Sequence, residues 1–367
     1  MKDTSVFLPA FGNRPTKLIG RDHVVQAFLK GLSHPIGHPD RAMVIIGQRG
    51  MGKTALLLEF AEKAEGQGFI VARATATESL LDDILGMIQH KGFSMVGKRP
   101  KVKGVSAGAF GFSAGLTFSE EIDKSYSFLN KMILLVDELA KYDKGIVILV
   151  DEIQASTPAL RVLTTAYQHL VGEGKDIVIA MAGLPHAVSS VLSDEVLTFF
   201  NRAKKIHLEP LSLSDVSVYY SKVLNNLGKE ISPENLEVVV NETRGYPYLL
   251  QLIGFYLLEY ADTSPEITPQ HIELACRSAR RDMIENIYEP VLKQLSKKDR
   301  QFLQAMAKDR EVSQIAEVKK RLKASDSVVH TYRKRLLDAG VIASERRGEL
   351  SFTLPYFNEY LDGGFFS

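Results

Sequence analysis

The chain of 367 residues is too long for one hydrophobic core and predicts two or three domains, for which its 45% hydrophobic content is sufficient. A single cysteine, Cys276, excludes a disulfide framework and a cysteine-rich metal site, and we expect it to be inert packing. The net charge of +1 excludes a uniformly basic or acidic chain, and no apolar run reaches the roughly 18 residues of a membrane span. These features predict a cytoplasmic protein without a membrane segment or signal peptide.

Short apolar runs rich in branched side chains predict the strands of a sheet. They lie at residues 42–47, 69–75, 145–150, 176–182 and 204–208, and helical stretches separate them. This alternation predicts a doubly wound, parallel α/β sheet. A glycine-rich segment without acidic residues, 99–119, interrupts the pattern and predicts an inserted antiparallel hairpin. The hairpin either touches nucleic acid or a neighbouring subunit, or is an ordinary edge hairpin.

After Pro210 the predicted strands stop and the pattern becomes helical, with Ser-Asp and Thr-Pro helix starts. We therefore predict three domains: a sheet domain at residues 1–208, a small helical domain at 209–285 and a basic C-terminal domain at 286–367.

A glycine-rich loop follows the first predicted strand and precedes an amphipathic helix. Its sequence, GQRGMGKT, satisfies the phosphate-binding pattern G-x-x-x-x-G-K-[ST], and its context is the one that this motif requires. The backbone N–H groups and the helix N-terminus would face phosphate oxygens of ATP, Lys53 would lie at the β- and γ-phosphates, and the Thr54 hydroxyl would bind Mg²⁺. The predicted nucleotide-binding residues here are Gly47, Gln48, Arg49, Gly50, Met51, Gly52, Lys53, Thr54 and Ala55.

Two adjacent carboxylates end the third predicted strand, IVILVDEIQ. Asp151 fits the Walker B role of holding Mg²⁺ together with Thr54. Glu152 is placed to deprotonate or orient an attacking water, which favours hydrolysis over transfer to a substrate hydroxyl and makes Glu152 and Lys53 candidate catalytic residues. A small-molecule kinase is disfavoured for the same reason.

The C-terminal residues form a basic unit in which residues 293–347 carry 15 Lys and Arg against 7 Asp and Glu. Three helical segments and two short strands follow one another, which is the order of a winged helix. Val328, Val329, Tyr332, Leu336 and Leu337 would face its core. Duplex DNA is the predicted partner, although winged helices also dock proteins. The predicted DNA-binding residues are His330, Lys334, Arg335, Arg346 and Arg347.

The order of motifs resembles that of AAA+ and STAND-type P-loop ATPases, including initiator-like ATPases. These motifs are GRD at 20–22, GQRGMGKT, VDEIQ, AGLP, FFNR, GYP at 245–247 and a terminal winged helix. The resemblance runs from Phe11 to Tyr360. It implies an ASCE-type, AAA+-like P-loop NTPase fold followed by a helical lid domain and a winged-helix domain.

The resemblance also implies roles for residues outside the P-loop. Gly20 and Arg21 would fall near the adenine with Ile19 packing on the base, and Tyr246 and Pro247 would close the adenine side from the lid. Arg202 stands where such ATPases place an arginine finger that reaches a neighbour's γ-phosphate, which implies a nucleotide-dependent homo-oligomer. The alternative is that Arg202 pairs with a surface acid.

The chain departs from the family pattern at two positions. The sensor 1 region reads IAMAGLP and offers no polar side chain, and Tyr248 or Leu249 stands where initiator-type relatives have the sensor 2 arginine. A slow, switch-like ATPase is therefore expected. Two hypotheses remain open: an ATPase that couples nucleotide state to DNA binding, and a STAND-like signalling switch whose winged helix docks a protein.

Overall fold

The structure is a computed structural model that describes residues 6–10, 17–96, 112–114, 117–118, 120–154, 156–344 and 346–363. The chain divides into two compact units. The sheet unit consists of Arg21–Gly47 and Lys53–Leu208. The C-terminal unit consists of Met1–Gly20, Glu209–Ser367 and five residues of the P-loop, Gln48–Gly52. The predicted division into domains at 1–208, 209–285 and 286–367 stays a prediction.

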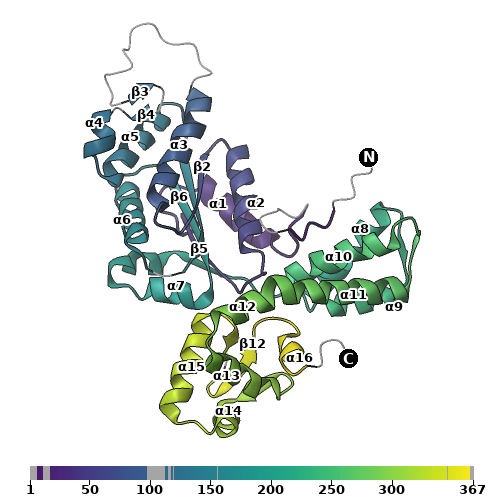
Figure 1. Ribbon diagram of the computed structural model, residues 1–367. Helices are drawn as coiled ribbons and strands as arrows, with labels where there is room; N and C mark the ends of the chain where they lie inside the picture. The colour runs from purple at the N-terminus through teal and green to yellow at the C-terminus, as the bar shows by residue number, and fades with distance from the viewer. Residues whose placement is uncertain are drawn as a thin grey trace. The chain divides into compact units, whose positions relative to one another are not determined.

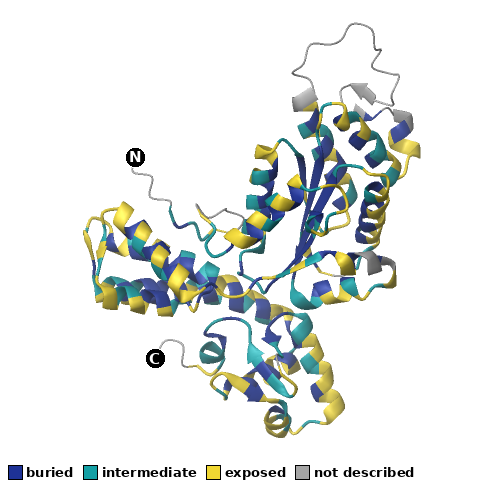
Figure 2. Cartoon of the chain, turned by 180° about the vertical axis from the view of Figure 1, so that it is seen from behind, coloured by how far each residue is buried: buried dark blue, intermediate teal, exposed yellow. Residues whose placement is uncertain are grey.

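A five-stranded parallel sheet forms the centre of the sheet unit, in the order β2-β5-β6-β1-β7. Its strands are β1 (Ala42–Ile46), β2 (Ile70–Thr75), β5 (Ile146–Ile153), β6 (Ile177–Gly183) and β7 (Lys204–His207). Every predicted strand is present, and β5, β6 and β1 are almost entirely buried, as Figure 2 shows. The expected α/β fold with a doubly wound parallel sheet is confirmed.

Helices cover both faces of this sheet (Figure 1). On one face lie α1 (Asp22–Ser33) and α2 (Lys53–Gly66), which pack through the stacked rings of Phe28 and Phe60, 4.0 Å apart. On the other lie α3 (Leu80–Val96), α5 (Phe128–Ala140) and α6 (Pro158–Gly172). The unit also contains α4 (Glu120–Ser125), α7 (Pro185–Leu192) and the 3₁₀ helices η1 (Pro39–Arg41) and η2 (Glu195–Arg202). The helices leave the carboxyl ends of the strands for the loops that carry the candidate site.

A short antiparallel hairpin occurs inside the predicted 99–119 segment. Its strands are β3 (Phe112–Ala114) and β4 (Thr117–Phe118). Residues 99–111, 115, 116 and 119 of this segment lie outside the described residues. The proposed contact of the hairpin with nucleic acid or another subunit stays a prediction.

Helices fill the first part of the C-terminal unit, as the sequence predicts. They are α8 (Leu213–Asn226), α9 (Pro233–Glu242), α10 (Pro247–Ala261) and α11 (Pro269–Met283), with the short strands β8 (Glu230–Ile231) and β9 (Glu266–Ile267) between them. The side chains of Ser212, Ser232 and Thr268 cap α8, α9 and α11 by accepting a backbone N–H. Cys276 is buried in α11, and burial raises the pKa of its thiol to about 12, which fits the expected inert role.

Four helices and a three-stranded antiparallel sheet follow, after the π-helix η3 (Ile284–Tyr288) and α12 (Glu289–Gln294). The sheet order is β10-β12-β11. The elements are α13 (Lys297–Ala307), β10 (Val312–Gln314), α14 (Ile315–Leu322), α15 (Asp326–Asp338), β11 (Ile342–Ala343), β12 (Glu349–Phe352) and α16 (Phe357–Leu361). Every helix among the described residues is too short or too polar to cross a lipid bilayer.

The prediction that Val328 of α15 faces the core is wrong. Val329 and Leu336 are buried, seven residues apart on one helical face, whereas Val328 is 39% exposed. Successive helical residues differ by about 100° around the axis, so Val328 points away from the face that holds Val329. Tyr332 and Leu337 are half-buried at the margins of that face.

Candidate functional site

The P-loop connects the end of β1 to the start of α2. Gly50 and Gly52 have φ values of +70° and +82°, which glycine adopts without strain and side-chain-bearing residues rarely adopt. The loop is held to the sheet where Gly47 N–H donates to the Gly183 carbonyl of β6 at 3.3 Å. Lys53 Nζ donates to the Gly47 carbonyl at 2.9 Å. The ammonium group of Lys53 therefore lies beside the first glycine of the motif, at the N-terminus of α2.

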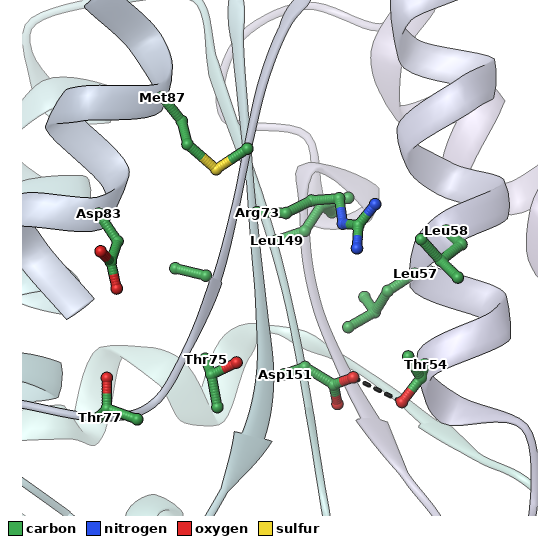
Figure 3. Close-up of a pocket in the computed structure, with 11 residues that line it drawn as sticks. Thr54, Leu57, Leu58, Arg73, Thr75, Thr77, Asp83, Met87, Leu149 and Asp151 are labelled. Atoms are coloured by element: carbon green, nitrogen blue, oxygen red, sulfur yellow. Dashed lines mark hydrogen bonds between the residues drawn. The ribbon is translucent and has the colours of Figure 1, made fainter. Parts of the chain in front are cut away.

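Thr54 and Asp151 meet at the carboxyl edge of the sheet, although they stand 97 residues apart. The Thr54 hydroxyl donates to Asp151 Oδ2 at 2.6 Å (Figure 3). Asp151 is aligned by its place in β5, where it is the partner of Thr75 in β2. The structure therefore brings together the two side chains that the sequence assigns to Mg²⁺.

Glu152 follows Asp151 in an unusual backbone conformation. Its φ is +55°, and the pairing of β5 with β6 is irregular between Val150 and Ile153. The Glu152 N–H donates to Asp151 Oδ1 at 2.8 Å, and the Glu152 side chain is exposed. A left-handed conformation is uncommon for residues other than glycine, and such residues cluster at functional sites.

The oxygens of Thr54 and Asp151 fit a magnesium ion. Mg²⁺ prefers hard oxygen ligands and is held through one or two carboxylates together with substrate phosphates. Within the described ranges, no group of three or more His, Cys, Asp and Glu side chains could hold a metal by itself. The side chains present therefore match an ion that arrives with a nucleotide.

A cavity of about 570 Å³ lies next to this pair in the sheet unit (Figure 3). Thr54 and Asp151 line one end of it, and Asp83 and Met87 of α3 line another part. Arg73 of β2 points into the cavity, and in the described part of the chain its guanidinium makes no hydrogen bond or ion pair. Arg73 is not among the site residues predicted from the sequence, although a charged residue inside the apolar run FIVARAT is a visible signal.

Within the C-terminal unit, Tyr246 contacts the P-loop directly. Its hydroxyl donates to the Arg49 carbonyl at 2.6 Å. A Cβ atom at Gly50 would stand 2.2 Å from the same hydroxyl oxygen, so this contact requires a glycine there. Burial raises the pKa of Tyr246 well above its usual value, and Tyr248 raises it further, so the hydroxyl keeps its proton.

The GRD and GYP motifs meet at Leu211 of the C-terminal unit. A Cβ atom on Gly245 would stand 2.3 Å from the Leu211 carbonyl oxygen, and a Cβ on Gly20 would stand 3.3 Å from the Leu211 side chain. The N–H of Leu211 also donates to the Gly245 carbonyl at 2.8 Å. Two turns that the sequence connects only through the family resemblance therefore share one neighbour.

The other predicted nucleotide residues take ordinary positions. Ile19 is half-buried, Arg21 is buried immediately before α1, and Pro247 is the first residue of α10. Arg202 is exposed at the end of η2 and has no hydrogen bond or ion pair with the residues that the structure describes. The alternative of a surface ion pair for Arg202 is therefore not seen. The roles of these residues toward adenine and γ-phosphate stay predictions.

Four of the five predicted DNA-binding residues are exposed without a described ion pair. His330 and Lys334 lie on α15, and Arg346 and Arg347 lie between β11 and β12. Arg335 differs, because its Nη2 lies 2.8 Å from Oδ2 of the fully buried Asp299. Asp299 also accepts hydrogen bonds from Ser296 in the capping box of α13. Arg335 therefore serves to neutralise a buried carboxylate, a pairing that helical spacing alone does not reveal.

Comparison with known families assigns the first part of this site. Residues 17–178 match the family described as AAA ATPase domain. The matched residues include the P-loop and the Thr54–Asp151 pair. Residues 285–361 match a domain of unknown function (DUF8462), and no curated protein matches the chain.

Solved structures agree with the AAA ATPase fold over nearly the whole chain. A Walker-type ATPase of Pyrococcus abyssi has a TM-score of 0.68 at 14% identity, with 95% of this chain and 97% of that chain covered. The ADP form of the ORC2 protein of Aeropyrum pernix has a TM-score of 0.60 at 18% identity, with 99% and 98% covered. Cdc6p of Pyrobaculum aerophilum has a TM-score of 0.52 at 16% identity, with 99% and 97% covered. At these identities the similarity establishes the fold alone, an α/β P-loop NTPase fold with a parallel sheet.

Proposed function

We propose that this protein is a slow, Mg²⁺-dependent ATPase whose nucleotide state controls the binding of duplex DNA by a C-terminal winged helix. The observation that carries the ATPase part is the hydrogen bond between Thr54 and Asp151 beside a complete P-loop. The ADP form of the A. pernix ORC2 protein supports nucleotide binding by this fold. The direct test is the ATPase rate, measured with and without duplex DNA across a range of protein concentrations.

Each residue of the site has a role in the proposed hydrolysis. Lys53 and the N–H groups of the first turn of α2 hold the β- and γ-phosphate oxygens, and Thr54 and Asp151 hold Mg²⁺. Bound Mg²⁺ neutralises charge that develops on the phosphates. Glu152 accepts a proton from the attacking water, for which its exposed carboxylate is available. Arg202, supplied by a second copy, would stabilise the charge on the γ-phosphate.

Slow turnover is supported by side chains that are absent or engaged elsewhere. Strand β6 is buried throughout and ends in Ala182 and Gly183, so it offers no polar group to the γ-phosphate. Arg244, the arginine nearest in sequence to the sensor 2 position, pairs with Glu359 at 3.0 Å and lies over the ring of Tyr356. Neither arrangement provides the additional charge stabilisation that fast phosphoryl transfer needs.

Oligomer-dependent activity is the first prediction. If Arg202 acts across an interface, specific activity rises with protein concentration, and Arg202→Ala removes the rise. A mixture of Arg202→Ala with Glu152→Gln regains part of the activity, because hybrid interfaces combine one intact Glu152 with one intact Arg202. Steady-state phosphate release measures this. Turnover that is independent of concentration and unchanged in Arg202→Ala would assign Arg202 a structural role.

DNA binding is supported by residues 296–361, in which the order of the first three helices and the three short strands fits a winged helix. His330 and Lys334 are exposed on α15, the candidate recognition helix, and Arg346 and Arg347 are exposed in the candidate wing. Such side chains bind phosphates without reading bases, so the contact would be chiefly electrostatic.

Salt dependence is the second prediction. With about 4 to 6 phosphates neutralised, the logarithm of the DNA affinity falls against the logarithm of salt concentration with a slope of roughly −4 to −5. Reversing Lys334, Arg346 and Arg347 to Glu removes binding and leaves ATP binding intact. Arg335 is left unchanged, because its loss would strand the buried Asp299 charge. Fluorescence anisotropy with a labelled duplex gives the affinities.

A matched control is the reversal of Lys30, Lys205 and Lys222, which are exposed on α1, β7 and α8 and change the net charge equally. Affinity that is insensitive to both triple reversals contradicts DNA binding at this surface. The alternative, a signalling switch whose winged helix docks a protein, would then explain the domain better. Val328 favours this alternative, because it is an exposed apolar side chain on α15.

A further inference from the structure

A four-residue loop in the C-terminal unit contacts both the P-loop and the last helix of the chain. We define this lid loop as Thr243–Tyr246, between α9 and α10. Its last residue, Tyr246, donates its hydroxyl to the Arg49 carbonyl at 2.6 Å and packs against Gly50. All of these residues belong to the C-terminal unit, which includes Gln48–Gly52. The lid loop therefore fixes the backbone at the centre of the P-loop.

The backbone of the lid loop has little freedom to absorb movement. Arg244 and Gly245 have φ values of +47° and +67°. The Gly245 N–H donates to Thr243 Oγ1 at 3.1 Å, and the Tyr246 N–H donates to the Thr243 carbonyl at 2.8 Å. Leu211 closes against Gly245 from outside the loop. A displacement at Arg244 is therefore transmitted to Tyr246, two residues away.

Tyr356, the residue before α16, holds the other side of the lid loop. Its ring lies 3.8 Å from the guanidinium carbon of Arg244 and 4.9 Å from that of Arg280. Its hydroxyl donates to the Glu242 carbonyl at 3.1 Å, and Glu242 pairs with Arg280 at 2.9 Å. Arg244 also pairs with Glu359 of α16. The Tyr356 ring is buried, whereas the Arg244 side chain is 47% exposed, so water screens this cation–π contact only in part.

We propose that the lid loop positions the P-loop through Tyr246 and is itself positioned by Tyr356 through Arg244. Binding of a partner to residues 296–361 and binding of nucleotide at the P-loop then influence each other. This inference rests on the proposed nucleotide binding. Tyr246 acts as a positioning residue, because its hydroxyl contacts the Arg49 backbone and leaves the phosphate-facing N–H groups free to bind. Coupling between two sites is reciprocal, so whatever engages residues 296–361 changes nucleotide affinity by the same factor.

The test is the affinity of the full chain for ADP and for a non-hydrolysable ATP analogue, measured by isothermal titration calorimetry. Tyr246→Phe loses the hydrogen bond and weakens both affinities by about 3- to 10-fold. Arg244→Ala and Tyr356→Leu each weaken them by roughly 2- to 5-fold. The double variant Arg244→Ala/Tyr356→Leu has about the same nucleotide affinity as the single variant that binds less tightly, because both changes remove the same contact. The KM for ATP rises in each variant, while kcat at saturating ATP changes less than about twofold.

Two control variants separate positioning from general loss of stability. Tyr256→Phe removes a hydroxyl that donates to Asp282 Oδ2 at 2.8 Å inside the same unit, ten residues beyond the lid loop along α10. Phe352→Leu removes an aromatic ring that packs against Phe357 without a described contact with the lid loop. Both controls bind nucleotide as the wild type does, at temperatures below their melting transitions.

Three results would overturn the inference. The first is wild-type affinity in Tyr246→Phe, and the second is equal weakening in the two controls. The third is weakening by Arg244→Ala with unchanged affinity in Tyr356→Leu, because Arg244 would then act on the nucleotide directly. Absence of nucleotide binding in the wild type would instead overturn the proposed function.

Discussion

Replacement of Lys53 by alanine is expected to weaken ATP binding by about 100-fold or more. Lys53 supplies the positive side chain over a loop otherwise built from backbone dipoles, and its Nζ already lies 2.9 Å from the Gly47 carbonyl. Charge-assisted hydrogen bonds to phosphate oxygens are about twice as strong as neutral ones, so removing the ammonium removes a large part of the affinity. Calorimetric titration with ATP and Mg²⁺ measures the change.

A matched control is Lys63→Ala, at the other end of the same helix. Lys63 is partly exposed and makes an ordinary pair with Glu59 at 3.5 Å. Lys63→Ala removes one positive charge from α2 and leaves the contact of Lys53 with Gly47 in place. It therefore tests whether the loss of charge alone weakens ATP binding. A folded Lys53→Ala protein with wild-type affinity would contradict the assignment of the phosphate site.

Replacement of Glu152 by glutamine is expected to lower kcat by about 100- to 10,000-fold while ATP remains bound. Gln preserves the size of the side chain and removes the carboxylate that accepts a proton from water in the proposed hydrolysis. Neither Thr54 nor Asp151 changes, so the Mg²⁺ ligands and the nucleotide affinity persist. Single-turnover hydrolysis and nucleotide titration on the same preparation separate the two effects.

Glu173→Gln is the control for Glu152→Gln, because Glu173 is an exposed carboxylate at the end of α6. Its turnover is expected to equal that of the wild type. Residual hydrolysis in Glu152→Gln at the wild-type rate would show that another group accepts the proton, and the exposed carboxylate of Glu152 would then have no catalytic role.

Local sequence signals predicted the elements of the sheet unit well, since each strand is an apolar run of the right length beside a helix. The P-loop and Asp151 were found for the same reason, because their spacing lies within short motifs. The strand order was not available from these signals: β6 lies between β5 and β1, and only the packing of distant segments determines this.

Contacts between distant residues account for what the sequence did not predict. Tyr246 and Arg49 are 197 residues apart, and nothing in either motif specifies their hydrogen bond. Arg335 was assigned to DNA because it is basic and lies on α15, but the carboxylate that it neutralises comes from α13. Arg73 was visible as a charge in an apolar strand, yet only the structure shows that it faces a cavity.

At position 152 the backbone is left-handed, so the residue that would be most stable there differs from the residue that the proposed chemistry needs. Glycine would adopt a φ of +55° without the penalty of roughly 1 kcal/mol or more that a residue with a Cβ incurs. A chain selected for folding alone would therefore drift toward glycine at this position. The carboxylate that the proposed hydrolysis requires therefore stands where glycine would be the more stable residue, a trade-off that directed evolution of this scaffold would have to resolve.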